Sequence, residues 1–514
     1  MARVAVQLTN FTGGELSPRL DGRNDLAKYA SGCSTLENLV VYPHGSAARR
    51  PGTNFVAAVK DSTKKTRLIP FEFSTTQTYM LEFGNQYIRF YKDNGQILSG
   101  GSAYEISTPY LEAELFDLKF AQSADVMYIC HPNHEVEKLS RTGHTSWSLT
   151  DVDFTNGPFL DANTTGTTLT PSNAATGSRT ITASAVTGIN GGSGFLTTDV
   201  GRQIHFNDGY GTITARASTT SITVNVTTAF ANANAITNWY LGAFSDTTGH
   251  PSCVTFFEQR LVFAATLNNP QTVYFSKSGD YENMDANLGG TIADDDAIIY
   301  TIASNQVNAI RFMTATRTLI IGTAGGEFAV SGGGEDNAIT PTNILIKKQS
   351  NHGAANVDAI AVGNATLFLQ RARRKIRELA YNFDVDGYVA PDMTILAEHI
   401  TEGGLTQVAY QQEPNQIIYA AREDGELVGL TYQREQQVTA WHRHIFGGRF
   451  GIATITVSDY ANIANKTKIT LTKSDGTTVD FDSTTGTAGT NEFKTETNNN
   501  TTATNLKNAI NAHA

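Results

Sequence analysis

The chain has 514 residues, of which 40% are hydrophobic and 17% are charged, and its formal net charge is −11. That apolar content excludes a wholly disordered chain, and the acidic balance argues against a dedicated nucleic-acid binder, which would usually be basic. The three cysteines, Cys33, Cys130 and Cys253, lie too far apart for a CxxC zinc or redox motif, and no apolar run is long enough to cross a membrane.

A phrase of three strands repeats along the chain and indicates a β-propeller. The second strand is the most apolar and is expected at 78–83, 126–130, 260–264, 318–322, 366–369 and 416–420. First strands precede it, as at 66–71 and 307–312, and third strands follow it, as at 87–91, 272–276, 327–330 and 426–430. Most second strands recur after roughly 47–58 residues, a period typical of propeller blades. We therefore predict a mainly β protein with about six recognisable blades, the first of them within 1–155 and the rest within 249–446.

One interval between second strands, of roughly 135 residues, breaks this period. Within it the composition changes to Thr, Ala, Asn, Gly and Ser, and short alternating strands appear at 203–206 and 221–226. Removal of this stretch restores the period. Residues 156–248 are therefore predicted to be an inserted β-barrel or β-sandwich domain.

The pattern of apolar and polar residues changes again after Phe446, and residues 447–514 are predicted to form a β-β-β-α module. Strands are expected at 454–457, 468–471 and 478–481, with a turn at 474–476 and a capped amphipathic helix at 502–510. A unit that ends on its helix leaves the apolar helix face uncovered. This favours a natural chain that continues beyond Ala514.

Few residues carry a pattern typical of chemistry. His131 and His134 flank a Pro-Asn turn and could ligate a metal ion, but no third ligand stands near them in the sequence, so a plain turn is favoured. Asp294, Asp295 and Asp296 lack the spacing of a calcium loop and are predicted to form an exposed turn. The segment 441–444, Trp-His-Arg-His, alternates as a strand that packs on one side and faces solvent on the other.

Motifs of catalytic propellers and other enzymes are missing. The Ser-x-Asp-x-Gly-x-Thr-Trp turn of sialidases does not occur, and neither does a GxSxG elbow, an HExxH motif or a P-loop. We therefore predict a protein that is not an enzyme, with no catalytic residues, no metal ligands and no cofactor.

The densest positive charge lies at 371–377. If this segment is a strand, Arg371, Arg373, Lys375 and Arg377 fall on one face, because side chains alternate. Four cations on one face repel one another unless an anionic group lies opposite. Three interpretations stay open: a solvated outer strand, a subunit interface with an acidic neighbour, or a contact with DNA phosphate.

The N-terminal region carries two phrases that resemble a known family. The first is Gly13-Gly14-Glu15-Leu16-Ser17-Pro18 and the second is Arg49-Arg50-Pro51-Gly52-Thr53. Both are similar to the opening of tail nozzle proteins (tail hub or tail tubular protein B-like) of short-tailed bacteriophages, where the second phrase begins the first blade. The segments 241–264 and 276–281 resemble the blade that follows the inserted domain in such proteins. The resemblance covers roughly 1–155 and 240–446.

The resemblance implies a structural role in the virion tail. A homohexameric ring would lie below an adaptor ring, conduct genomic double-stranded DNA without sequence-specific binding, anchor fibres or spikes, and be closed by a constriction or a plug protein before infection. Assembly would take place in the cytoplasm of the bacterial host. The family offers no catalytic residues to transfer.

Two alternatives to the tail-nozzle hypothesis remain. A carbohydrate-active propeller would need convergent carboxylates and an aromatic platform at its mouth. A generic propeller scaffold would bind protein partners without conducting DNA. A single propeller has a narrow, side-chain-lined centre, so we expect DNA to follow the axis of a ring of subunits.

Overall fold

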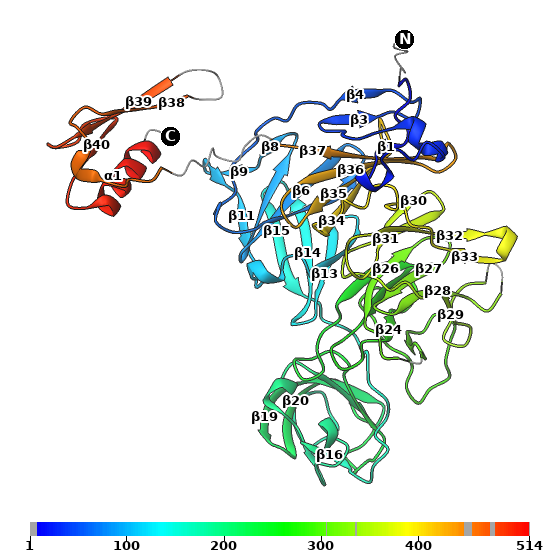
Figure 1. Cartoon of the computed structure of the whole chain (residues 1–514). Helices are drawn as coiled ribbons and strands as arrows, with labels where there is room; N and C mark the ends of the chain where they lie inside the picture. The colour runs from blue at the N-terminus through cyan, green and yellow to red at the C-terminus, as the bar shows by residue number, and fades with distance from the viewer. Residues whose placement is uncertain (1–7, 305, 335–336, 447–454, 473–477, 513–514) are drawn as a thin grey trace. The chain divides into compact units, whose positions relative to one another are not determined.

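The computed structural model describes residues 8–304, 306–334, 337–446, 455–472 and 478–512 (Figure 1). The chain divides into two compact units, residues 1–445 and 446–514. Among the described residues, no helix has the length and apolar character needed to cross a membrane.

Within the described part of the chain, and apart from a six-stranded sheet inserted after the second of them, six antiparallel sheets of four or five strands follow one another, and we number these blades one to six in chain order. Each blade runs from an inner first strand to an outer last strand. The strands are, blade by blade, β5 (Arg67–Ser74), β6 (Gln77–Gly84), β7 (Tyr87–Lys92) and β11 (Glu105–Ser107); β12 (Lys119–Ser123), β13 (Val126–His131), β14 (His134–Gly143) and β15 (Ser146–Asp151); β22 (Cys253–Phe257), β23 (Arg260–Ala264), β24 (Thr272–Phe275) and β25 (Ile298–Thr301); β26 (Ile310–Ala315), β27 (Leu319–Thr323), β28 (Gly326–Ser331) and β29 (Leu345–Ser350); β30 (Ile360–Val362), β31 (Ala365–Leu369), β32 (Ile376–Asn382) and β33 (Gly387–Val389); β34 (Leu405–Gln411), β35 (Ile417–Arg422), β36 (Leu427–Gln433) and β37 (Val438–His444).

Short elements complete the blade connections. In blade one, β8 (Gly95–Gln96) pairs with β7, and β9 (Leu98–Ser99) pairs with β10 (Ser102–Ala103). The 3-10 helix η3 (Glu112–Glu114) precedes blade two, and η6 (Phe383–Val385) joins β32 to β33.

The predicted propeller is confirmed, and the predicted second strands are the second strands of the six blades. In β23, β27 and β31 every residue is buried. Both faces of a blade's sheet pack on neighbouring blades, so a strand in the middle of the blade is apolar throughout rather than alternating.

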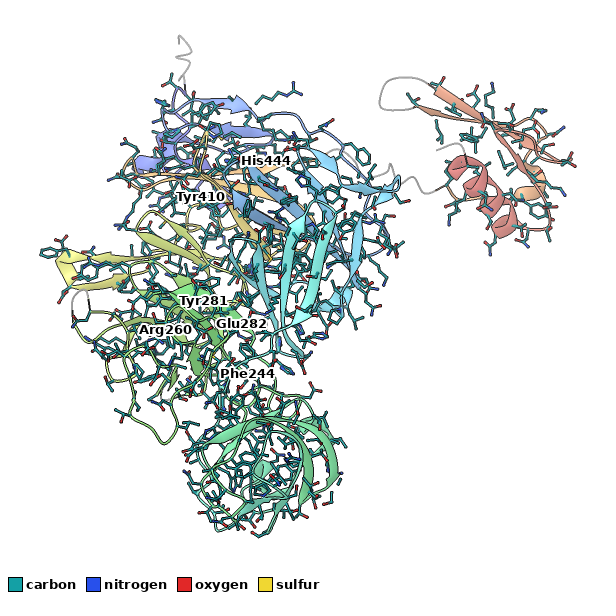
Figure 2. All side chains as sticks on the ribbon, turned by 180° about the vertical axis from the view of Figure 1, so that it is seen from behind. Phe244, Arg260, Tyr281, Glu282, Tyr410 and His444 are labelled. Atoms are coloured by element: carbon teal, nitrogen blue, oxygen red, sulfur yellow. The ribbon has the colours of Figure 1, made fainter. Side chains whose placement is uncertain are left out.

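Apolar clusters join each blade to the next. From blade one to blade six, successive blades contribute to common clusters, which hold Leu81 and Ile129, Phe263 and Tyr128, Val262 and Ile321, Ile320 and Phe368, and Leu367 and Ile418. Polar contacts add to them: Glu282 of blade three, which is labelled in Figure 2, accepts from Tyr128 (3.0 Å) and Lys138 (2.8 Å) of blade two. Blade six returns to blade one, where Gln407 Nε2 donates to the Leu68 carbonyl at 3.1 Å.

The N-terminal segment covers the outer strand of blade six. Its elements are β1 (Gly14–Glu15), η1 (Pro18–Leu20), η2 (Ala27–Ser31), β2 (Gly32–Cys33), β3 (Leu39–Val41) and β4 (Ala47–Arg49). Leu36 and Val41 pack on Val438 and Ala440 of β37. The outer edge of the last blade is therefore shielded by the beginning of the chain.

Between blades two and three the chain forms a separate six-stranded sheet with its own core. The strands are β16 (Leu169–Pro171), β17 (Gly177–Ala183), β18 (Gln203–Phe206), β19 (Gly209–Ser218), β20 (Ser221–Thr228) and β21 (Trp239–Leu241), with η4 (Asn190–Gly192) and η5 (Thr197–Asp199) in the loops. Leu169 and Ile236 exchange backbone hydrogen bonds of 2.9 and 3.0 Å, which closes the sheet into a small barrel. Phe206, Ile222 and Trp239 lie in its core.

Removing this barrel should leave the propeller folded. Phe159 and Gly242 form a β-bridge where the chain leaves and re-enters the barrel, so a short Gly/Ser linker in place of 159–242 has little distance to span. We expect a soluble protein with one cooperative thermal transition, followed by circular dichroism. An insoluble product, or the loss of cooperative unfolding, would show that the blades depend on the barrel.

The second unit holds a three-stranded sheet and a helix. Its elements are η7 (Tyr460–Asn462), β38 (Lys468–Thr472), β39 (Thr478–Thr484), β40 (Glu492–Lys494) and α1 (Asn499–Asn511). The order β-β-β-α is as predicted, but the strands differ: residues 455–457 are not a strand, and the third strand is β40, which pairs in parallel with β39. The predicted turn at 474–476 and Thr454 lie outside the described residues.

Candidate functional site

The axis of the propeller is crossed by charged side chains. Asp358, just before β30 of blade five, accepts from Lys119 of β12 at 2.8 Å and lies 3.7 Å from Arg67 of β5. Blades two and five stand opposite each other in a ring of six, so the Lys119–Asp358 ion pair joins opposite walls. The major groove of a DNA duplex alone is about 12 Å wide. A duplex therefore cannot pass along this axis.

Arg67 is held in the wall beside a cavity of about 270 Å³ that Ile69, Phe120 and Val408 help to line. Its Nη1 donates to the carbonyls of Leu115 (2.9 Å) and Leu118 (2.8 Å). Burial lowers the pKa of this guanidinium, and the nearby Asp358 opposes that shift. Two buried cations, Lys119 and Arg67, thus face the half-exposed carboxylate of Asp358 at the centre.

Most of the basic segment at 371–377 is not a strand, and this corrects the prediction: residues 371–375 form a turn, and only Ile376 and Arg377 belong to a strand. Residues 371–374 connect β31 to β32, and Arg373 has φ of +59°. Strand β32 begins only at Ile376, so the four cations do not share a face. The alternation rule fails here because a blade must reverse its chain direction between its second and third strands.

Most of the charge in this turn is neutralised within the chain. Arg373 lies 2.7 Å from Glu423, Arg374 lies 3.0 Å from Glu402, and Lys375 lies 2.7 Å from Asp392. Arg377 donates to Gln370 Oε1 (2.9 Å) and to the Ala390 carbonyl (2.6 Å). Arg371 is exposed. Asp392 and Glu402 lie in the connection between blades five and six, and Glu423 lies in blade six, so these ion pairs join the two blades within one chain.

The Gly-Gly-Glu-Leu-Ser-Pro phrase fastens the N-terminal segment to the last two blades. Glu15 is buried and accepts from the Leu36 amide (2.7 Å), His399 Nε2 (2.9 Å) and Arg443 Nη2 (2.9 Å). Ser17 Oγ donates to Glu398 Oε1 at 2.8 Å. Leu16 is buried and Pro18 begins η1.

Steric crowding explains why both Gly13 and Gly14 of this phrase are glycines. Gly14 has φ of +68°, and a Cβ there would lie 2.4 Å from the Trp441 backbone nitrogen. A Cβ on Gly13 would lie 2.9 Å from the carbonyl oxygens of Lys28 and Ser31. Only glycine allows the backbone to approach β37 and η2 this closely.

The Arg49-Arg50-Pro51-Gly52 phrase does not begin the first blade. Arg49 ends β4, and Arg50 donates to Asn38 Oδ1 (3.1 Å) and to the Ile445 carbonyl (3.2 Å). Pro51 and Gly52 are exposed, and the first blade strand begins at Arg67. The phrase therefore belongs to the N-terminal segment.

The β32–β33 hairpin projects from blade five (Figure 1), and its tip carries two exposed apolar side chains among acidic ones. At this tip Phe383 is 86% exposed and Val385 is 62% exposed. The hairpin is braced by Tyr381, whose hydroxyl donates to Asp386 Oδ1 (2.5 Å) and whose ring meets that of Tyr388 edge to face. Sequence reasoning missed this surface because Phe383 lies in a short polar stretch without periodicity.

Two further predictions on charged residues need correction. Asp296 is buried and accepts from Lys277 Nζ at 2.8 Å, although Asp294 and Asp295 are exposed as expected. Backbone carbonyls of all three aspartates surround the Arg260 guanidinium. The three aspartates therefore cluster because the chain reverses direction around the buried Arg260 guanidinium, and they do not form a free exposed turn.

The Trp-His-Arg-His segment of β37 is more buried than its alternation predicts. His442 and His444 are both buried, as is Trp441, because the N-terminal segment covers the face that was expected to meet solvent. His442 Nδ1 and His444 Nε2 lie 2.8 Å apart. His131 and His134 do form a turn, but the structure also brings Glu114 beside them.

Comparison with known proteins shows little sequence similarity. No family model matches the chain, and no curated protein matches it. Solved structures that resemble it include the Pan2 WD40 domain of Neurospora crassa (8% identity, 65% of this chain and 79% of the other, TM-score 0.29). Another is YCF48 bound to D1 peptide (9%, 74% and 98%, TM-score 0.31). A third is the β-propeller domain of Cps50 (Swd1) from Myceliophteria thermophila (9%, 72% and 100%, TM-score 0.32). The sheets of the described residues alone show that the chain is a six-bladed β-propeller with an inserted barrel and a C-terminal α+β unit.

Proposed function

We propose that this chain is a structural subunit of the tail nozzle of a short-tailed bacteriophage, assembled with copies of itself into a ring. The observation that carries the proposal is the pair of apolar side chains at the tip of the β32–β33 hairpin, Phe383 and Val385, which are largely exposed. The N-terminal phrases that resemble nozzle proteins support the same conclusion. A role in catalysis forms no part of the proposal.

The hairpin tip has the properties of an interface anchor. Aromatic side chains are enriched at the cores of protein interfaces, and a projecting Phe383 gains its burial only from another molecule. The brace by Tyr381, Asp386 and Tyr388 holds the tip in one conformation, which lowers the entropy cost of docking. The occupant we propose is a second copy of this chain, in a head-to-tail contact that closes a sixfold ring.

The path of DNA follows from the blocked propeller axis. Because Lys119 and Asp358 cross that axis, a duplex would pass through the bore between subunits. The net charge of −11 suits a wall that repels phosphate and lets the duplex slide. In this proposal the ring sits in the virion tail between an adaptor ring and fibres, spikes or a plug protein, and it is assembled in the host cytoplasm.

The double variant F383D/V385D tests the role of the hairpin. We expect the wild type to form a sixfold ring in native mass spectrometry and the variant to be a monomer, because two carboxylates would be buried without partners. The thermal midpoint of the monomer should be unchanged, since both side chains are exposed. The control is L267D/V307D, which places the same charges on exposed apolar positions elsewhere.

Three other outcomes are informative. A monomeric wild type at high concentration would contradict the nozzle and favour a propeller that binds other proteins. A ring that survives in F383D/V385D would move the interface away from the hairpin. Loss of the ring in the control as well would show that no single hairpin carries the assembly.

A further inference from the structure

The turn between β13 and β14 places two imidazoles side by side. His131 ends β13 and His134 begins β14, and the two residues are register partners across the hairpin. Partners in an antiparallel pair project their side chains to the same side of the sheet. The ring centroids of His131 and His134 are accordingly 5.0 Å apart.

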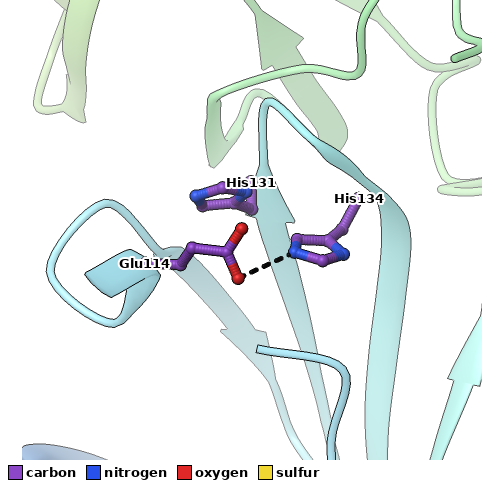
Figure 3. A group of neighbouring side chains, drawn as sticks. All are labelled: Glu114, His131 and His134. Carbon is purple, nitrogen blue, oxygen red and sulfur yellow. Dashed lines mark hydrogen bonds and ion pairs between the residues drawn. The ribbon is translucent and has the colours of Figure 1, made fainter. Parts of the chain in front are cut away.

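A carboxylate from another part of the chain completes the group. Glu114 belongs to η3, before blade two, and its Oε2 accepts from the Leu111 amide at 2.9 Å. The same oxygen lies 3.0 Å from His134 Nε2. One donor atom from each of Glu114, His131 and His134 lies within 4.8 Å of the others (Figure 3).

The group is partly removed from solvent. His131 is only 3% exposed, while Glu114 and His134 are half-buried. The Tyr110 ring packs edge to face on His134 at 5.2 Å and shields it from solvent.

We propose that Glu114, His131 and His134 bind a divalent transition-metal ion, and that Zn²⁺ fits the donor set. Two imidazoles and one carboxylate are common zinc ligands, with bond lengths of about 2.0–2.2 Å in tetrahedral geometry. Such bonds place donor atoms about 3.3 Å apart. A contraction of the present group is enough to reach that spacing. Three protein ligands leave a fourth position for water or another donor.

Binding would change one contact in the turn. The Asn133 amide now donates to His131 Nδ1 at 3.3 Å. If Nδ1 ligates the metal its lone pair is used, and if Nε2 ligates then Nδ1 carries the proton. In both cases the Asn133 hydrogen bond must break, and the amide becomes free to exchange.

The metal would tie together two neighbouring segments of the chain. Glu114 lies in the connection from blade one, and the histidines lie in a hairpin of blade two. The same hairpin accepts a hydrogen bond at the Pro132 carbonyl from the His250 amide (3.1 Å), where the chain returns from the barrel. The site is independent of the proposed ring, since all three ligands come from one chain.

The experiment uses the untagged full-length chain after dialysis against a chelator. Isothermal titration with Zn²⁺ should give one tight site per chain, and Co²⁺ should give the intense visible bands of a four-coordinate ion. Zinc should also raise the thermal midpoint, because the ion binds only the folded state. H134A and E114Q should each weaken zinc binding by about 100-fold or more, since a lost ligand costs at least as much as a lost outer-shell partner.

Matched controls keep the proposal falsifiable. E112Q changes the other acidic residue of η3, and H352A removes a histidine elsewhere, so both should bind zinc as the wild type does. Faster hydrogen exchange at Asn133 on adding zinc is a readout that needs no variant of buried His131. A wild type that takes up no zinc, or equal binding in H134A and E114Q, would reduce the group to a plain His134–Glu114 ion pair and overturn the proposal.

Discussion

Acidifying the protein from pH 6.5 to pH 5 should lower its free energy of unfolding by about 3 kcal/mol through His442 and His444 alone. Both imidazoles are buried under the N-terminal segment, and His442 Nε2 lies 3.2 Å from the Thr431 hydroxyl. Burial, and then the neighbouring His444, lowers the pKa of His442 to about 3. Burial, and then the charge of Arg50, lowers the pKa of His444 to about 4.

Stability falls with pH because the pKa values of both His442 and His444 are lowered in the folded state. Below about pH 6.5 the unfolded chain takes up a proton on each histidine, whereas the folded chain stays neutral until pH 4 to 3. Stability is therefore complete above pH 6.5 and falls steadily as the pH drops through this window. Urea unfolding at pH 7, 6 and 5 measures the slope.

The double variant H442Q/H444Q should lose most of this slope while H44Q, at an exposed position, keeps it. The wild-type slope contains other groups as well, including buried His205, whose pKa is lowered by its burial. The difference between wild type and double variant isolates the pair. An identical slope in the two proteins would mean that the pair can accept protons in the folded state.

The substitution G14A should destabilise the protein by about 3 kcal/mol, combining overpacking with a left-handed backbone. The added Cβ would lie 2.4 Å from the Trp441 nitrogen and 2.7 Å from the Ala440 Cα, both backbone atoms that cannot rotate away. The N-terminal segment would lift from β37 and uncover Glu15. Limited proteolysis should then cut this segment early, and urea unfolding should report the loss.

The matched control is G22A. Gly22 has φ of +79°, but a Cβ there meets nothing within 4 Å. It should therefore cost only about 1 kcal/mol, the strain of a non-glycine residue at positive φ. Equal effects of G14A and G22A would show that the close approach to β37 adds nothing.

The sequence predicted the middle of each blade far better than its outer edge. Second strands such as β23 and β31 are buried on both faces, so they read as continuous apolar runs. Fourth strands such as β29 (Leu-Ile-Lys-Lys-Gln-Ser) meet solvent and carry polar residues, a composition that is also typical of loops. A prediction from apolar runs therefore found three strands where each blade has four.

Local sequence patterns could not predict contacts between residues from different elements. His131 and His134 are visible as a pair, but Glu114 joins them only because η3 folds back onto the β13–β14 hairpin. The acidic partners of the basic turn, Glu402 and Glu423, lie 28 and 50 residues from their arginines. No local spacing rule connects them.

The N-terminal segment also sets a delay during protein synthesis. Glu15 leaves the ribosome early, yet its partner Arg443 is 428 positions later. At translation rates of about 5–20 residues per second, that interval lasts roughly 20 to 90 seconds. During this time a carboxylate destined for the interior stays in water, and the apolar side chains around it have no blade to cover. Blade six is thus the last blade to be made, and the N-terminal segment reaches its final place only after that blade has been synthesised.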